Sequence, residues 1–190
     1  MPSLLAVVGA VTPPGRLNQA VQLVAELAQA RPGGTASVLN LAEQRVSFAD
    51  GRPLERYADD TARVVSAVAA ADLVVLASPV YRATFTGALK NLLDLIPVEA
   101  LRGKPVGIVA MGASAHHYLG VDWHLRAVLA WFGALVAPTS VYLDSGHFKD
   151  GKLADAGARA ALGDLVAGLF ALAGHAGDTL GPPPLAAGRG

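Results

Sequence analysis

The stretch DLVVLASPVY, residues 72–81, decides the fold. After Asp72 it has an apolar run without a polar position, which is typical of a strand buried on both faces of a parallel sheet. Pro79 then fixes its own φ and lacks an N–H, so the strand ends in a stiff, extended turn that presents Tyr81. Such a turn suits a flat ring.

Similar apolar runs lie on either side of this stretch and predict strands at residues 4–8, 35–41, 72–77, 105–111 and 139–143. Between and after them, helical spacing of apolar residues predicts helices at residues 18–30, 54–71, 84–95, 118–132 and 153–173. Parallel neighbours need crossover connections, so the alternation predicts an α/β three-layer sandwich with a five-stranded parallel sheet. The expected strand order is 2-1-3-4-5, the flavodoxin-like arrangement.

The composition fits a single domain. Of the 190 residues, 53% are hydrophobic and 16% are charged, which is enough apolar material for a large core. We expect one domain over residues 1–176. The segment 177–190 is rich in Gly, Pro and Ala, and we expect it to be a disordered tail.

The balance of charges and the absence of cysteine exclude several classes of function. Fifteen basic residues balance fifteen acidic ones, which leaves no net field to attract nucleic acid or a membrane surface. Without cysteine, disulfides, thiolate metal sites and cysteine nucleophiles are excluded. The start of the sequence lacks the pattern of a secretory signal, and no apolar run reaches the roughly 18 residues of a membrane span. We therefore expect a cytoplasmic protein.

The ligand is expected beyond the carboxyl ends of the strands, where the strand order reverses. The segments that follow those ends are residues 9–18, 77–86 and 111–118. The first, GAVTPPGRLN, combines a turn, a basic residue and a helix start, which suits a phosphate. It matches neither the nucleotide-triphosphate loop nor GxGxxG. The alternatives stay open: an ordinary loop with an exposed arginine, and a Tyr81 that packs on the surface.

Several motifs resemble one family. The NAD(P)H-dependent FMN reductases are similar over residues 4–138, and the later motifs are most similar to the flavin reductases of two-component alkanesulfonate monooxygenase systems. The motifs are SPVY at 78–81, GALK at 87–90, LLD at 92–94, His116, and VDW at 121–123.

This resemblance implies an NAD(P)H:FMN oxidoreductase that transfers hydride from NADPH or NADH to FMN. It also implies reduced flavin supplied to a partner monooxygenase, and a homo-oligomer, dimer or tetramer. Carried over by position, the cofactor-binding residues at the phosphate are Thr12, Arg16, Leu17 and Asn18. Those along the ring and the ribityl chain are Pro79, Val80, Tyr81 and Arg82. Those at the polar edge of the ring are Gly112, Ala113 and Ser114.

One departure from the family pattern concerns the first loop. The family usually has Gly-Ser-x-Arg where this chain has Gly9-Ala10-Val11-Thr12. Thr12 cannot supply the missing charge, and a hydrogen bond to a charged group contributes about 1.5–3 kcal/mol. We therefore expect FMN to bind weakly and to exchange.

The helix predicted at residues 118–132 carries two further hypotheses. Trp123 occupies the position that looks equivalent to a π-bulge at the tetramer interface of the related branch, the alternative being a Trp on an ordinary helix. The helix also has more apolar residues than one surface face needs, which favours either oligomerisation or full burial; they include Leu125, Val128, Leu129, Trp131 and Phe132. No metal is expected, because His116, His117 and His124 lack acidic partners at ligand spacing.

Rival functions remain at this stage. A quinone or azo reductase would hold FMN tightly and pass electrons to an organic acceptor. An electron-carrier flavodoxin is usually strongly acidic, so the neutral charge counts against it. A flavin-binding module without nicotinamide activity is the remaining alternative.

Overall fold

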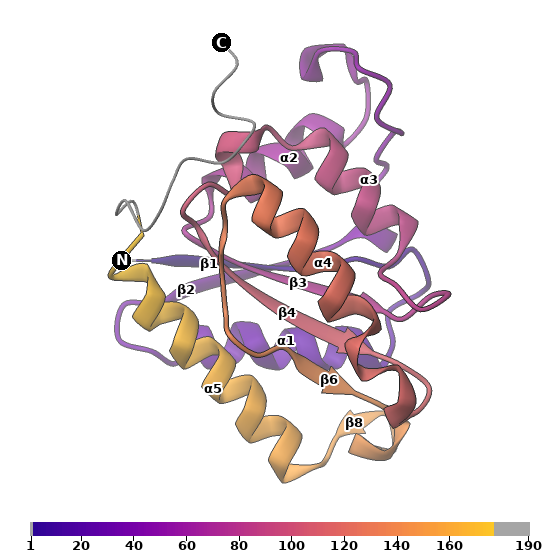
Figure 1. Ribbon diagram of the computed structural model, residues 1–190, viewed down its shortest axis with the longest axis vertical. Helices are drawn as coiled ribbons and strands as arrows, with labels where there is room; N and C mark the ends of the chain where they lie inside the picture. The colour runs from indigo at the N-terminus through magenta and orange to yellow at the C-terminus, as the bar shows by residue number, and fades with distance from the viewer. Residues whose placement is uncertain (1, 177–190) are drawn as a thin grey trace.

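A parallel sheet forms the centre of the computed structural model, which describes residues 2–176 (Figure 1). The strand order is β2-β1-β3-β4-β5, with β6 also paired to β4, so the flavodoxin-like order is confirmed. The predicted tail, 177–190, lies outside the described residues. The strands are β1 (Ser3–Val8), β2 (Thr35–Asn40), β3 (Leu73–Pro79), β4 (Pro105–Met111), β5 (Leu135–Val136) and β6 (Val141–Leu143).

The fifth position of the sheet is shared by β5 and β6, which pair with opposite halves of β4. The sequence predicted one strand here, at residues 139–143. Pro138 separates the two short strands and has no N–H to continue the ladder. The two-residue β5 is too short to produce a periodic signal.

Helices cover both faces of the sheet (Figure 1). One buried cluster lies under α1 (Arg16–Gln29) and α5 (Ala156–Ala173). The other lies under α2 (Thr61–Ala70), α3 (Gly87–Leu95) and α4 (Tyr118–Phe132). Alternate residues of β3 enter opposite clusters, which explains why this strand has no polar face. Each fully buried Val or Leu contributes about 1.5–3 kcal/mol of burial free energy.

The predicted helix at 54–71 begins later, at Thr61. The segment before it is held by side chains instead. The Asp59 carboxylate accepts hydrogen bonds from Ser47 Oγ at 2.6 Å and from Thr61 N at 3.0 Å. Asp60 accepts from Arg45 N at 2.9 Å. These bonds compete with a continuous helix, which is why the apolar spacing alone placed its start too early.

The last helix also begins later than predicted. A short hairpin of β7 (Phe148–Lys149) and β8 (Lys152–Leu153) occupies the start of the predicted range, and Asp155 caps α5 by accepting from Ala158 N at 2.7 Å. Among the described residues, α5 is the one helix whose length and hydropathy would allow it to cross a membrane. Its buried side chains, among them Leu162 and Leu169, pack in the cluster beneath the sheet. One face of this helix therefore packs against the sheet.

Candidate functional site

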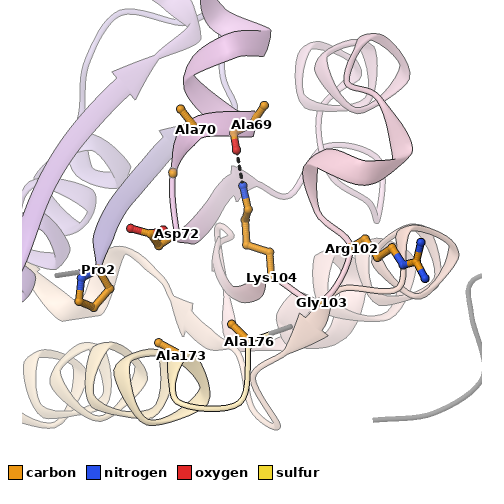
Figure 2. A pocket seen from close by; sticks show the side chains of 10 residues that line it. Pro2, Ala69, Ala70, Asp72, Arg102, Gly103, Lys104, Ala173 and Ala176 are labelled. Atoms are coloured by element: carbon orange, nitrogen blue, oxygen red, sulfur yellow. Dashed lines mark hydrogen bonds between the residues drawn. The ribbon is translucent and has the colours of Figure 1, made fainter. Parts of the chain in front are cut away.

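One cavity lies at the amino end of the strands, opposite the expected ligand edge (Figure 2). It has a volume of about 550 Å³. Two polar side chains that line it, Lys104 and Asp72, make hydrogen bonds at the ends of helices and strands. Lys104 Nζ donates to the carbonyls of Val68 and Ala69, both at 2.9 Å, at the end of α2. Asp72 accepts from Ser3 N at 2.7 Å and Ser3 Oγ at 2.8 Å.

The titration of these two groups agrees with a structural role. Burial lowers the pKa of Lys104, and the nearby Asp72 opposes that shift. The bonds from Ser3 hold the pKa of Asp72 below its usual value. Both groups therefore make hydrogen bonds that hold the fold together. For this reason we do not take this cavity as the candidate site.

A second cavity, of about 300 Å³, lies at the carboxyl ends of β1, β2, β3 and β4. It coincides with the edge at which the sequence placed the ligand. The predicted site residues that line it are Thr12, Arg16, Leu17, Asn18 and Pro79. Two further lining residues come from other strands: Asn40, which lies outside the predicted segments, and Met111, which begins the predicted segment 111–118 but was not a predicted binding residue. In the strand register, Val8 pairs with Asn40 and Pro79 with Met111, so strands that end together bring both to the cavity.

The β1–α1 loop, residues 9–15, forms one wall of this cavity. The N-cap of α1 is Gly15, and within residues 2–176 no side chain caps this helix end. The first N–H groups of α1 are therefore available to an anion, and the helix dipole favours one. Pro13 and Pro14 carry no N–H, so the loop before the helix contributes fewer donors. Leu17 is buried and anchors the helix, whereas Arg16 is exposed.

The β3–α3 turn, residues 79–86, borders the cavity through Pro79. Tyr81 and Thr84 exchange backbone bonds of 2.8 and 3.1 Å, and Tyr81 is 47% exposed. The two residues between them, Arg82 and Ala83, have φ of 51° and 66°. That is the conformation of a tight hairpin turn, here without glycine. The turn therefore has a fixed shape at an exposed position.

Neighbouring elements hold this turn from two sides. Val80 N donates to Met111 O at 2.8 Å, which ties the turn to the end of β4. A Cβ on Gly120 of α4 would lie 2.9 Å from Ala83 O, so glycine is needed for the helix to approach. Gly120 was not among the predicted site residues, because its contact with the turn exists only in the packed structure.

The β4–α4 loop, residues 112–117, follows Met111 at the same edge. A Cβ on Gly112 would lie 1.9 Å from Tyr142 Oη, so any other residue there would displace the Tyr142 hydroxyl. The Tyr142 hydroxyl donates to Ser114 O at 2.6 Å. Burial, with a contribution from Asp144, raises the pKa of this phenol, which keeps it a neutral donor. The side chain of Tyr142 thereby fixes the loop backbone.

The structure thus brings the three predicted segments to one edge of the sheet. Only some of their predicted residues line the cavity, and the others lie beside it. Five of the predicted residues line the cavity, as named above. The others lie in the adjoining turn and loop without lining it: Val80, Tyr81, Arg82, Gly112, Ala113 and Ser114. Their binding roles stay predictions.

Trp123 lies on α4 and is 72% exposed. The helix is α-helical from Tyr118 to Phe132 and has no π-bulge at Trp123 in this structure. Leu125 and Leu129 belong to the core, so the apolar excess of this helix is partly burial. The exposed apolar side chains that remain on it are Tyr118, Leu119, Trp123 and Trp131. Among the described residues, no group of three His, Cys, Asp or Glu gathers for a metal ion.

Comparisons with known proteins identify the family of this chain. The sequence profile of a family described as NADPH-dependent FMN reductase matches residues 2–148. An NAD(P)H-dependent FAD/FMN reductase of Geobacillus thermodenitrificans is 40% identical over 129 residues, which cover 68% of this chain and 70% of that protein. The NADH-dependent FMN reductase SfnF of Pseudomonas putida is 33% identical over 140 residues, 73% of this chain and 75% of that protein.

The fold has solved counterparts as well. The apo form of an NADH:FMN oxidoreductase superposes with a TM-score of 0.76 at 22% identity, covering 100% of this chain and 97% of that one. At this identity, the likeness bears on the fold.

Proposed function

Because the chain belongs to the NADPH-dependent FMN reductase family, and is thereby an NAD(P)H:FMN oxidoreductase, we propose that it delivers reduced FMN to a partner flavin-dependent monooxygenase of the alkanesulfonate type. The observation that carries the proposal is the cavity at the carboxyl ends of the strands, onto which the uncapped start of α1 and the extended end of β3 both open. FMN has an anionic phosphate at one end and a flat ring at the other. These two walls fit it.

The phosphate end is assigned to the β1–α1 loop and the first turn of α1. The backbone N–H groups of Arg16, Leu17 and Asn18 lie where the dipole of α1 favours negative charge. The Arg16 side chain adds a positive charge at the mouth of the cavity. Thr12 contributes a hydroxyl in place of the family arginine.

The ring end is assigned to the other two segments. Pro79, Val80, Tyr81 and Arg82 provide the surface for the ring and the ribityl chain. The backbone of residues 112–114, held by Tyr142, faces the polar edge of the ring and stabilises negative charge that develops there. Arg82 is exposed and is available to the phosphates of the nicotinamide nucleotide.

The two cofactors supply the chemistry: a hydride passes from nicotinamide C4 to flavin N5, and one proton from solvent completes reduced FMN. The chain itself needs no acid–base pair for this step. Its residues bind both cofactors, align them and exclude water from between them. The rigid β3–α3 turn serves this purpose because its shape is set before a ligand arrives.

FMN is proposed to exchange freely, as a substrate does. Two features of the β1–α1 loop support this: Thr12 lacks the charge of the family arginine, and Pro13 and Pro14 offer no N–H donors. Extensive dialysis of the purified protein is expected to remove the flavin. Retention of stoichiometric FMN would instead favour a quinone or azo reductase with a tightly held cofactor.

Steady-state oxidation of NADPH and of NADH, with and without added FMN, tests the proposal. A flavin-substrate reductase depends on excess free FMN, and its rate saturates with FMN concentration. A rate that depends on a quinone or azo acceptor and ignores free FMN would refute it. A coupled assay with an alkanesulfonate-type monooxygenase then tests delivery, since catalase-insensitive product formation requires reduced FMN to reach that enzyme.

We also propose that the chain assembles into a homo-oligomer, dimer or tetramer, through the exposed apolar side chains of α4. Trp123 lies at the centre of that surface in sequence, between Leu119 and Trp131. Burying large aromatic side chains of this kind is a common source of interface affinity. A cytoplasmic location stays a prediction.

A further inference from the structure

A buried threonine lies between the two segments that are assigned to the ends of FMN. Thr86 is the N-cap of α3 and is 4% exposed. Its hydroxyl donates to the carbonyl oxygen of Gly9, the first residue of the β1–α1 loop. The hydroxyl oxygen of Thr86 also accepts from Leu89 N at 3.1 Å and so caps the helix. The single proton of this hydroxyl is thus directed at the β1–α1 loop.

The backbone of Thr86 connects to the other segment. Its N–H donates to Ser78 Oγ at 3.1 Å, and Ser78 Oγ donates to Pro79 O at 2.9 Å. Ser78 is completely buried. A continuous set of hydrogen bonds therefore runs from Gly9 through Thr86 and Ser78 to Pro79, the residue that lines the cavity from the β3–α3 turn.

The packing around Gly9 leaves this connection little freedom. Gly9 N donates to Ala77 O at 2.7 Å. A Cβ on Gly9 would lie 2.8 Å from Leu89 Cβ and 3.0 Å from Ala77 O, closer than real Cβ contacts. Glycine is therefore required for α3 to approach the end of β1. The close approach in turn brings Gly9 O within reach of the Thr86 hydroxyl.

We propose that Thr86 is a positioning residue that fixes the separation between the phosphate-binding and ring-binding segments, and that it thereby sets the preference for FMN over flavins without a phosphate. The inference rests on the proposed function. A ligand held at both ends must match the separation of its two binding segments, whereas a ligand held at the ring alone does not. Only the doubly held ligand is sensitive to a shift of Gly9 relative to Pro79.

Substitution of Thr86 by valine separates shape from hydrogen bonding. Valine is nearly the same size, but it cannot donate to Gly9 O or cap α3, and it leaves that carbonyl buried without its partner. The dissociation constants for FMN and for riboflavin are measured by fluorescence titration in wild type, Thr86→Val and Thr86→Ser. Riboflavin has the same ring and ribityl chain without the phosphate, so it is the matched ligand.

The expected result is selective. In Thr86→Val, the dissociation constant for FMN rises about tenfold, and that for riboflavin stays within about twofold. Thr86→Ser, which keeps the hydroxyl, stays within about threefold of wild type for FMN. In turnover, Thr86→Val raises the KM for FMN and largely retains kcat at saturating FMN, because the ring-binding segment is unchanged. A role in folding alone would not produce this split.

Two outcomes overturn the inference. One is an FMN affinity unchanged in Thr86→Val; the other is a loss of riboflavin affinity as large as the loss of FMN affinity. If thermal unfolding shows that Thr86→Val is not folded, Thr86→Ala takes its place. Alanine also lacks the hydroxyl but does not add a methyl group in the buried site, and the same results are expected. Failure of the proposed function shows separately, as a wild type whose NAD(P)H oxidation does not depend on free FMN.

Discussion

Replacing Thr12 by arginine is expected to tighten FMN binding about tenfold. Thr12 lines the cavity at the β1–α1 loop, near the uncapped start of α1, where the phosphate is proposed to bind. A hydrogen bond to a charged group contributes about 1.5–3 kcal/mol. Because residue 12 is exposed, solvent screens the new interaction, and the lower end of this range applies. That end corresponds to about a tenfold change in the dissociation constant.

Fluorescence titration at two salt concentrations measures this effect. The gain is expected to shrink as salt rises, because salt screens exposed charges. Thr12→Gln is the matched control, since it adds length without charge and should bind FMN about as wild type does. Riboflavin should gain nothing from either substitution. An FMN affinity unchanged in Thr12→Arg, or an equal gain for riboflavin, would refute the placement of the phosphate beside residue 12.

Three further changes test other parts of the molecule. Tyr142→Phe removes the bond to Ser114 O, and we expect the KM for FMN to rise about fivefold while the melting temperature changes little; an unchanged KM would contradict the role given to residues 112–114. Hydrogen bonds, first among them that from the Ser47 side chain, lower the pKa of Asp59 from 3.8 to about 2. Because the pKa is lower in the folded state, these bonds stabilise the fold above pH 3.8, and the stabilisation is lost as the pH falls toward 2. Acid titration followed by circular dichroism should therefore show that Asp59→Asn loses less stability than wild type over that pH interval. Equal losses in the two proteins would contradict the stabilising role of the Asp59 carboxylate. Trp123→Ala is expected to lower the oligomer mass in sedimentation experiments at equal protein concentration, and an unchanged mass would rule out this surface as the interface.

The sheet was predictable because its strands bury both faces. In β3, Leu73, Val75 and Ala77 enter one cluster and Val74 and Leu76 the other, so the sequence shows an unbroken apolar run. Element boundaries were less predictable where side chains decide them. The bonds that Asp59 and Asp60 make ahead of α2 leave no trace in the apolar spacing.

The candidate site was predictable only where its residues are local in sequence. The β1–α1 loop and Pro79 show their character through prolines, glycines and a basic residue, and the strand order places them at one edge. Asn40 was missed because the sheet register, a long-range property, brings it to the cavity. Thr86 could be recognised as a helix start, yet its bond to Gly9 joins residues 77 positions apart. No local pattern contains that contact.

The two ends of the site differ in rigidity, and this difference bears on product release. In the β3–α3 turn, Arg82 and Ala83 hold positive φ angles that ordinarily cost about 1–2 kcal/mol each for residues with a Cβ. Backbone pairing of Tyr81 with Thr84 and the close approach of Gly120 maintain that shape. The surface proposed to bind the ring therefore has its shape before a ligand arrives, while the end proposed to bind the phosphate lacks the family arginine and two N–H donors. On the proposed function, we expect a protein built this way to align the ring for hydride transfer and yet to hold the nucleotide loosely, a combination that suits an enzyme that releases its reduced flavin.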